Sequence, residues 1–152
     1  MLYSILKWIH VLAAVLAVGA NATYGVWITR AARRPQDLSF TLRGIQWIDD
    51  RMANPAYALS LVSGLLMVWV GRLNLATPWL LTSLVLYVLL VLLGLLGYTP
   101  TLRQQIRALE SQGPDAPRYQ ALARRGIWLG IILAVLAMAV LFLMVVKPPL
   151  WA

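Results

Sequence analysis

The sequence has no cysteine, and this absence excludes several kinds of chemistry. Disulfides, thiolate metal sites, iron–sulfur clusters and covalently attached c-type haem all require cysteine side chains. Charge is also scarce, since only 12% of the 152 residues are charged, and His10 is the single histidine. No serine–histidine–aspartate set, zinc-protease motif or phosphate-binding loop is present. The sequence therefore predicts no catalytic residue and no metal site.

Hydrophobic residues make up 61% of the chain and gather in four stretches. A transmembrane helix needs about 20 mostly apolar residues to cross a hydrocarbon core of about 30 Å. We expect spans at about residues 2–28, 52–70, 79–98 and 126–146. The first is expected to be a retained helix and not a cleaved signal peptide, because its apolar run continues to Ile28. The fold prediction is an all-α membrane protein, a single integral membrane domain over residues 1–152 that forms a four-transmembrane-helix bundle.

The loops contain further helical segments. Between the first two spans, apolar residues recur at helical spacing, which predicts a short amphipathic interfacial helix on the inner membrane surface, beginning near Pro35: Leu38, Leu42, Ile45 and Ile48. Residues 112–117 form a clear helix breaker, with one glycine and two prolines. Residues 101–110 are expected to extend the third helix into the cytoplasm, and residues 118–125 to begin the fourth.

The distribution of positive charge predicts the orientation. Short loops rich in lysine and arginine stay in the cytoplasm. Ten of the thirteen basic residues lie in the first and third loops: Arg30, Arg33, Arg34, Arg43, Arg51, Arg103, Arg107, Arg118, Arg124 and Arg125. We therefore expect a multi-pass protein of the cell membrane with loops 1 and 3 cytoplasmic and both termini outside. The basic residues flank helices and are not interleaved with aromatics, so the expected partner is the lipid bilayer and not nucleic acid.

Polar residues within a membrane span are costly, so each is a functional candidate. His10 and Asn21 are eleven positions apart and point nearly the same way on a helix, and Lys7 and Tyr24 lie on or beside this polar stripe. If the stripe faces the bundle interior, His10 can serve as an axial ligand of haem b. The alternative is that His10 hydrogen-bonds to a neighbour at the interface and Asn21 links two helices.

A single histidine supplies only one axial imidazole within one chain. The second ligand would have to be a methionine, another subunit or an open position, and the candidate methionines are Met67, Met138 and Met144. No aspartate or glutamate lies within a predicted span, which weighs against a cation-coupled transporter. Asp49 and Asp50, beside Arg51, predict local salt bridging or capping of a helix end, with a contact to a partner as the alternative.

The last span carries Gly126, Gly130 and Ala134 at four-residue spacing. Small residues at this spacing let two transmembrane helices approach closely. They therefore indicate packing against another helix, either within the chain or in a homo-oligomer or larger membrane complex.

Several short motifs occur in an order that resembles a known family. They are LKWIHVL at 6–12, WIDD at 47–50, NPA at 54–56, SGL at 63–65, PW at 78–79, SLVLY at 83–87, and Pro100 followed by Leu102, Arg103 and Ile106. The chain resembles a bacterial family of predicted four-helix integral membrane proteins, a domain of unknown function.

The opening Leu-Lys-x-x-His and the later Pro-Ala segment are also distantly similar to HemJ-type protoporphyrinogen oxidases and CopD-type copper-resistance proteins. The HemJ likeness implies that His10 binds haem. The chain departs from that pattern, because it has no second histidine and no lysine between Trp8 and Val146.

Two main hypotheses for function follow. The first, which the lack of catalytic groups favours, is a non-catalytic accessory or structural bundle that acts by helix association in the membrane. The alternative is a haem b-binding membrane redox protein of the HemJ type, with His10 as axial ligand. A weaker third hypothesis is a membrane protein that handles copper or a solute.

Overall fold

The computed structural model describes residues 1–150, and all the regular secondary structure in that range is helical. Four long helices follow one another, and each is long and apolar enough to cross a membrane: Leu2–Ala31, Pro35–Val70, Pro78–Gln112 and Pro117–Val146. The elements within them are α1 (Leu2–Ala31), α2 (Pro35–Ile48), η1 (Asp49–Ala53), α3 (Asn54–Val70), α4 (Pro78–Leu93), η2 (Gly94–Tyr98), α5 (Thr99–Gln112) and α6 (Pro117–Val146).

The second and third long helices each contain one π-helical turn, η1 and η2. Each turn ends two residues before a proline, Pro55 after η1 and Pro100 after η2. Proline inside a helix removes one backbone hydrogen bond and its ring clashes with the carbonyl four residues earlier, and a wider turn relieves that clash. The extra residue also rotates the helix face by about 100°. The buried faces before and after the turn can therefore both point into the bundle.

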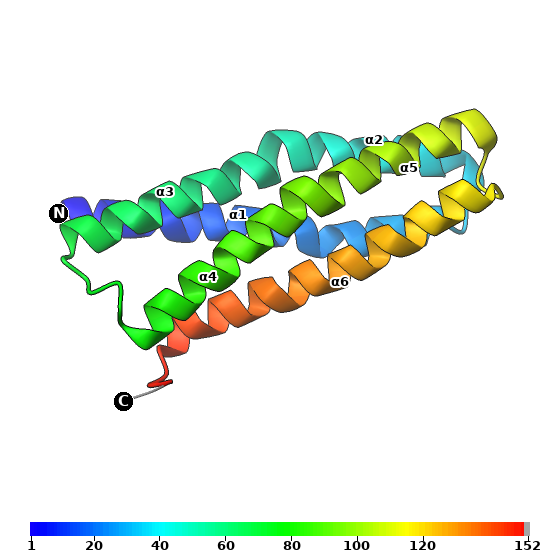
Figure 1. Cartoon of the computed structure of the whole chain (residues 1–152). Helices are drawn as coiled ribbons and strands as arrows, with labels where there is room; N and C mark the ends of the chain where they lie inside the picture. The colour runs from blue at the N-terminus through cyan, green and yellow to red at the C-terminus, as the bar shows by residue number, and fades with distance from the viewer. Residues whose placement is uncertain (151–152) are drawn as a thin grey trace.

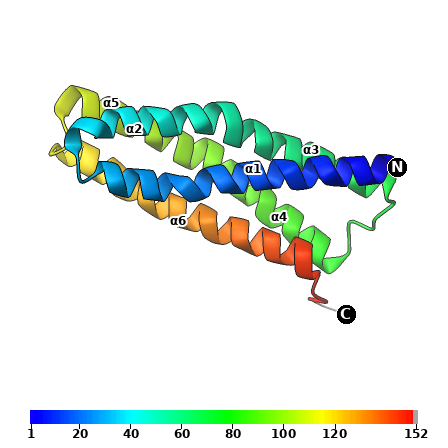
Figure 2. The same ribbon diagram turned by 180° about the vertical axis from the view of Figure 1, so that it is seen from behind.

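The helices pack as two pairs that join at one end. α1 lies along α3, and α4 lies along α6 (Figures 1 and 2). The two pairs are held together by α2 against α5 and by α1 against α6. The N-terminus lies at the opposite end of the bundle, beside the end of α3 (Figures 1 and 2).

The buried hydrophobic core lies mainly where α2 and α5 pack together. Leu42 is fully buried there, and Leu102 is 2% exposed. Large apolar residues from the amphipathic faces of both helices meet the adjacent ends of α1 and α6 in one cluster: Tyr24, Ala31, Leu38, Leu42, Ile45, Tyr98, Leu102, Ile106, Ala108, Leu109 and Tyr119. This end of the bundle is therefore packed like a water-soluble four-helix domain.

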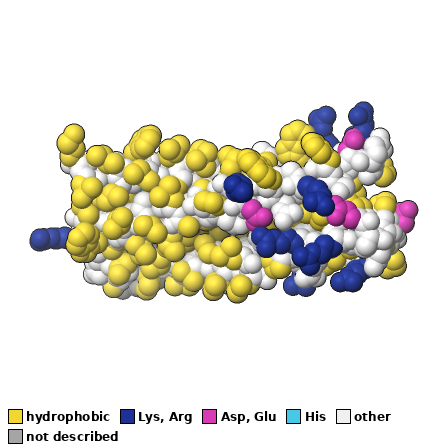
Figure 3. All heavy atoms as spheres, turned by 90° about the horizontal axis from the view of Figure 1, so that it is seen from above, with side chains coloured by type: hydrophobic (Ala, Val, Ile, Leu, Met, Phe, Trp, Pro, Cys, Tyr) yellow, Lys and Arg dark blue, Asp and Glu magenta, His cyan; other side chains and the backbone are white. Residues whose placement is uncertain are grey.

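The remaining length of the bundle has an apolar exterior. Residues such as Val15, Val62, Val85 and Val135 are each more than half exposed. Figure 3 shows hydrophobic side chains over one end and the middle of the visible face, whereas acidic and most basic side chains gather at the α2–α5 end. A helix of 30 residues is about 45 Å long, against a hydrocarbon core of about 30 Å. The α2–α5 end is thus the part that extends beyond the membrane.

The all-α four-helix prediction is confirmed, and so is the presence of an amphipathic helix that begins at Pro35. This helix differs from the expectation in its surroundings. It continues through η1 into α3, and Leu38, Leu42 and Ile45 are buried against α1 and α5. The reason is that α5 offers a complementary apolar face, which shields these residues within the protein. The predicted breaker is also present, and Gly113 adopts a φ of 85°, which favours glycine.

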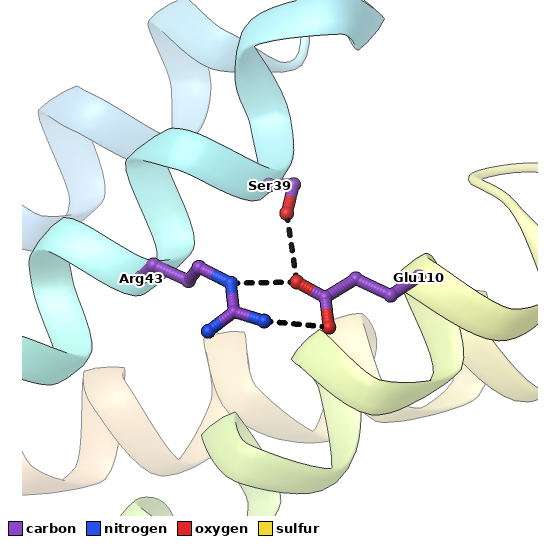
Figure 4. A network of polar contacts seen from close by, with 3 residues as sticks. All are labelled: Ser39, Arg43 and Glu110. Carbon is purple, nitrogen blue, oxygen red and sulfur yellow. Dashed lines mark hydrogen bonds and ion pairs between the residues drawn. The ribbon is translucent and has the colours of Figure 1, made fainter.

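A polar network joins α2 to α5 on the surface of this end (Figure 4). The guanidinium of Arg43 donates from Nε and Nη2 to the two carboxylate oxygens of Glu110, at 2.7 and 2.9 Å. The Ser39 hydroxyl donates to the same carboxylate at 3.0 Å. The hydrogen bonds from Arg43 and Ser39 lower the pKa of Glu110. The network therefore holds α2 and α5 in register at the edge of their apolar contact.

Candidate functional site

His10 on α1 packs against α3, near the end of the bundle where the chain begins. Its Nδ1 atom lies 2.8 Å from the backbone carbonyl oxygen of Ser60. Because a carbonyl can only accept, this contact places the ring proton on Nδ1 and leaves Nε2 with a free lone pair. The hydroxyls of Ser60 and Ser63 lie 3.4 Å from the same nitrogen. A Cβ atom on Gly64 would stand 3.0 Å from the ring, so glycine permits this approach.

A second polar layer links three helices in the middle of the bundle. Asn21 on α1 donates from Nδ2 to the Tyr57 hydroxyl on α3, at 2.6 Å. The Tyr87 hydroxyl on α4 donates to the Tyr57 backbone carbonyl, also at 2.6 Å. The rings of Tyr57 and Tyr87 meet edge to face, with centroids 6.3 Å apart. This layer is the main hydrogen-bonded connection between the α1–α3 pair and α4.

A third layer centres on Asp49, which is only 4% exposed. Its Oδ2 atom accepts a hydrogen bond from the Thr99 hydroxyl at 2.9 Å and from the Asn54 amide at 3.3 Å. Asn54 and Thr99 are the residues directly before Pro55 and Pro100. The carboxylate therefore ties the π turn of one long helix to the π turn of the other.

Asp50 behaves differently from its neighbour Asp49. It lies at the surface and forms an ion pair with Arg103, with the two side chains 2.9 Å apart. The expected salt bridging is therefore found at Asp50, while Asp49 is turned inward by the π-helical turn that it begins.

A pocket of about 160 Å³ lies between the second and third layers. Its walls are mainly apolar, and its polar groups come from α1, α3, the two π-helical segments and the first residue of α5. The lining residues are Asn21, Asp49, Asn54, Tyr57, Ala58, Leu61, Leu90, Val91, Gly94, Leu95, Tyr98, Thr99 and Leu133. Ala58 and Leu95 are also exposed, so the pocket reaches the outer apolar surface beside α3 and η2.

Two tyrosines extend the pocket region toward the buried core. Tyr24 and Tyr98 stack with ring centroids 6.4 Å apart and planes inclined by 8°. The Tyr24 hydroxyl is buried and has no hydrogen-bond partner in the part of the chain that the structure describes. A buried hydroxyl without a hydrogen bond lowers the stability of the fold, so the site contains one unsatisfied hydrogen-bonding group.

Only three of the four residues of the predicted polar stripe on α1 face the bundle interior. His10, Asn21 and Tyr24 point into the bundle, where they contact α3 or η2. Lys7 is exposed and lies outside the polar layers. Across residues 1–150, no three histidine, aspartate or glutamate side chains gather as a metal site.

In the small-residue ladder on α6, Gly126 and Gly130 are half-buried and Ala134 is exposed. A Cβ atom at Gly126 would meet only the Gln105 side chain, at 3.5 Å. One at Gly130 would meet no neighbour within 4 Å, and Ala134 is exposed. The part of the ladder at Gly130 and Ala134 therefore borders the outer surface, with the exposed apolar residues Ile127 and Ile131 beside it.

Sequence reasoning missed the layer around Asp49 and the pocket beside it. Charge patterning alone assigned Asp49 to local salt bridging or to capping of a helix end, because Asp50 and Arg51 follow it directly. The useful indication was the pair of dipeptides Asn54-Pro55 and Thr99-Pro100, each preceded by a helical segment. A polar residue before a mid-helix proline points to a distorted turn with backbone groups to satisfy.

Comparison with known proteins gives one match over nearly the whole chain. The model of a family described as predicted integral membrane protein (DUF2269) matches residues 4–148. No curated protein and no solved structure matches the chain significantly. The apolar helices, their lengths and this match agree, and the chain belongs to the DUF2269 family of predicted integral membrane proteins.

Proposed function

We propose that the protein is an accessory membrane bundle, a single integral membrane domain that associates laterally with another transmembrane helix through the outer face of α6. The observation that carries this proposal is the ladder of Gly126, Gly130 and Ala134. A Cβ atom added at Gly130 would have no neighbour within 4 Å, so there is open space beside this residue. Glycine lowers helix propensity and contributes no apolar surface to lipid. Its presence on an outward face is explained when a partner helix packs closely against it.

The arrangement of the helix pairs supports the same role. α6 packs on α4 and α5 with its inner face, which includes Ala137, Val140 and Leu143. Gly130 lies two turns before Ala137 at the edge of this inner face, and the exposed Ala134 borders the outer surface. A Cβ atom at Gly130 would meet no neighbour within 4 Å, so this edge is available to a helix from a second copy or from a different subunit. The protein would then act by holding its partner in place, and no reacting group is required of it.

The test is the mass of the protein extracted from its native membrane in mild detergent. The expected result is a species larger than the single 16.9 kDa chain, whether a homo-oligomer or a mixed complex. Gly130→Leu should reduce it to the single chain, because a leucine side chain separates the helices. Gly19→Leu is the matched control, since a Cβ atom at the exposed Gly19 would likewise meet no neighbour within 4 Å. A single-chain mass for the unaltered protein, or a complex that survives Gly130→Leu, would contradict the proposal.

We also propose the orientation given by the charge distribution, with loops 1 and 3 cytoplasmic and both termini outside. The basic residues of these two loops lie at the α2–α5 end, together with most of the acidic residues (Figure 3). Arginines at this level can contact the anionic lipids of the inner leaflet. The polar cap and its buried core would therefore project into the cytoplasm.

A second candidate is a haem b protein, and one observation favours it. The hydrogen bond from His10 Nδ1 to the Ser60 carbonyl resembles the way proteins orient a metal-binding imidazole, because it fixes the tautomer and leaves Nε2 as the ligand atom. Met67 lies one turn beyond Ser63 and Gly64 on the same helix face. When bound, a haem would supply redox chemistry, and this chain would contribute the axial imidazole.

The available space fits this candidate less well, because the His10 ring is wedged against Gly64 and the pocket at Asp49 is lined by other residues. The absorption spectrum of the protein from its native membrane decides the matter. A Soret band that is lost in His10→Ala, but kept in Lys7→Ala, would support haem ligation. A featureless spectrum would remove this candidate and leave lateral association as the proposed role.

A further inference from the structure

We propose that the pocket beside Asp49 binds a small organic ammonium ion, with the charged nitrogen at the carboxylate and an apolar body along the walls. The proposal is independent of lateral association through α6. Three observations support it: the buried carboxylate, the free oxygen of that carboxylate, and a mainly apolar cavity of matching size.

The carboxylate of Asp49 is only partly satisfied. Both of its hydrogen bonds reach Oδ2, and among residues 1–150 no side-chain or backbone donor reaches Oδ1. The two ion pairs in the described residues involve Asp50 and Glu110 and leave Asp49 without a cation. A buried carboxylate is stable as an anion only when it is paired, so a cationic partner from outside the chain would complete the site.

The size of the pocket restricts the ligand. A dry cavity of about 150 Å³ lined by apolar side chains can hold a benzene molecule. The pocket here measures about 160 Å³, which suits a body of about six to eight non-hydrogen atoms. Leu61, Leu90, Val91 and Leu133 supply apolar walls, whereas Asn21 and Tyr57 line the polar side.

An organic ammonium ion fits these groups better than a metal ion. Ca²⁺ and Mg²⁺ take six or more oxygen ligands or keep several bound waters, and the pocket offers one carboxylate among mainly apolar walls. An ammonium group donates up to three hydrogen bonds, so Asp49 Oδ1 and a side-chain oxygen such as that of Asn54 can accept from it. The exposed edges at Ala58 and Leu95 give such a ligand a route from the lipid side of the bundle.

The test uses benzylammonium as the probe and the full chain in detergent micelles, measured by isothermal titration calorimetry against protein-free micelles. Benzyl alcohol is the neutral comparison, because it has the same ring and no charge. We expect saturable binding of benzylammonium that Asp49→Asn weakens by about tenfold to a hundredfold, the range for one charge-assisted hydrogen bond. Binding of benzyl alcohol should be weaker and unchanged by this substitution.

A steric variant keeps the test decisive if Asp49→Asn fails to fold. Gly94 lines the pocket, and a Cβ atom there would meet no neighbour within 4 Å, so Gly94→Leu adds volume at the wall without a direct clash. It should abolish binding, whereas the matched Gly19→Leu should not. Binding that is unaffected by Asp49→Asn and Gly94→Leu would overturn the proposal. So would equal affinity for benzylammonium and benzyl alcohol, since Asp49 would then carry a proton and not an organic cation.

Discussion

At the scale of single residues, three polar side chains of the apolar half each have a partner on a different helix. His10 reaches Ser60, Asn21 reaches Tyr57, and Tyr87 reaches the Tyr57 backbone. Hydrogen bonds between transmembrane helices contribute about 0.6 kcal/mol on average and up to about 1.7 kcal/mol. Their contribution here is therefore as much to the relative position of the helices as to total stability.

A substitution at Gly64 tests how tightly the His10 ring is packed against α3. A Cβ at this position would stand 3.0 Å from Cε1 and 3.2 Å from Nδ1 of His10, and the ring cannot move away without lengthening its bond to Ser60. We expect Gly64→Ala to lower stability by about 1–3 kcal/mol, the usual cost of overpacking. The measurement is thermal unfolding in mild detergent. Gly19→Ala, which meets no neighbour, is the control and should be neutral or slightly stabilising. Equal midpoints for the two variants would show that the ring relaxes freely.

The residues of the site differ in how far the sequence could predict them. The inward direction of His10, Asn21 and Tyr24 follows from helical periodicity, which a straight helix such as α1 obeys. Asp49 could not be placed this way, because the π turn rotates it relative to the residues on either side. Its partner Thr99 lies fifty positions later in another helix, a proximity that depends on the whole bundle.

At the scale of elements, α2 and α5 form a packed layer and do not lie separately on the lipid surface. Each is amphipathic, and the two apolar faces bury one another beside the ends of α1 and α6. The presence of four long apolar helices, the helix start at Pro35 and the breaker before Pro117 were predictable, since they depend on local composition. The partner of the α2 apolar face was not, because lipid and α5 satisfy the same hydrophobic pattern.

Leu42 distinguishes these two surroundings. It is 0% exposed in the contact with α5, so Leu42→Ala should leave a cavity and lower stability by about 2–5 kcal/mol. A leucine resting on lipid would cost far less. Leu65→Ala is the matched control, because Leu65 is 45% exposed on the outer face of α3, and we expect a loss below about 1 kcal/mol. Unfolding midpoints of the two variants in the same detergent provide the measurement, and similar small losses would argue against the α2–α5 core.

The ion pair between Arg43 and Glu110 should make the α2–α5 contact sensitive to pH. The pKa of Glu110 is lowered in the folded state, from an ordinary value of 4.5. The stabilisation is therefore present above pH 4.5 and is lost as the pH falls through the lowered folded pKa. We expect Glu110→Gln to lower the unfolding midpoint slightly at pH 7, with the difference disappearing in acid and shrinking at about 1 M salt. Asp115→Asn is the control, since Asp115 forms no ion pair among the described residues. A difference that persists in acid and salt would have another cause.

At the scale of the whole molecule, the bundle is divided along its length into two environments. One end has a buried core, surface ion pairs and most of the charge, whereas the rest exposes apolar side chains around a few polar layers (Figure 3). Hydrophobic burial in water stabilises the first part, and lipid solvation with close helix contact stabilises the second. The Asp49 pocket lies near the boundary between them, beside the π-helical turns of both long helices.

The side of the membrane that the charged end faces can be determined by cysteine labelling. Because the chain has no cysteine, a single introduced thiol is the only one that can react. Ala76→Cys places a thiol in the exposed loop between α3 and α4, and Asp115→Cys places one in the exposed loop between α5 and α6. If the positively charged end is cytoplasmic, a membrane-impermeant maleimide should label Ala76→Cys in intact cells and Asp115→Cys only after lysis. Neither position belongs to the core, so both variants should fold. The reverse pattern would place the charged end outside, and labelling of both in intact cells would mean that the chain inserts in two orientations. The expected pattern would place the ammonium pocket nearer the inner leaflet, so that a ligand entering beside Leu95 would come from the cytoplasmic half of the bilayer.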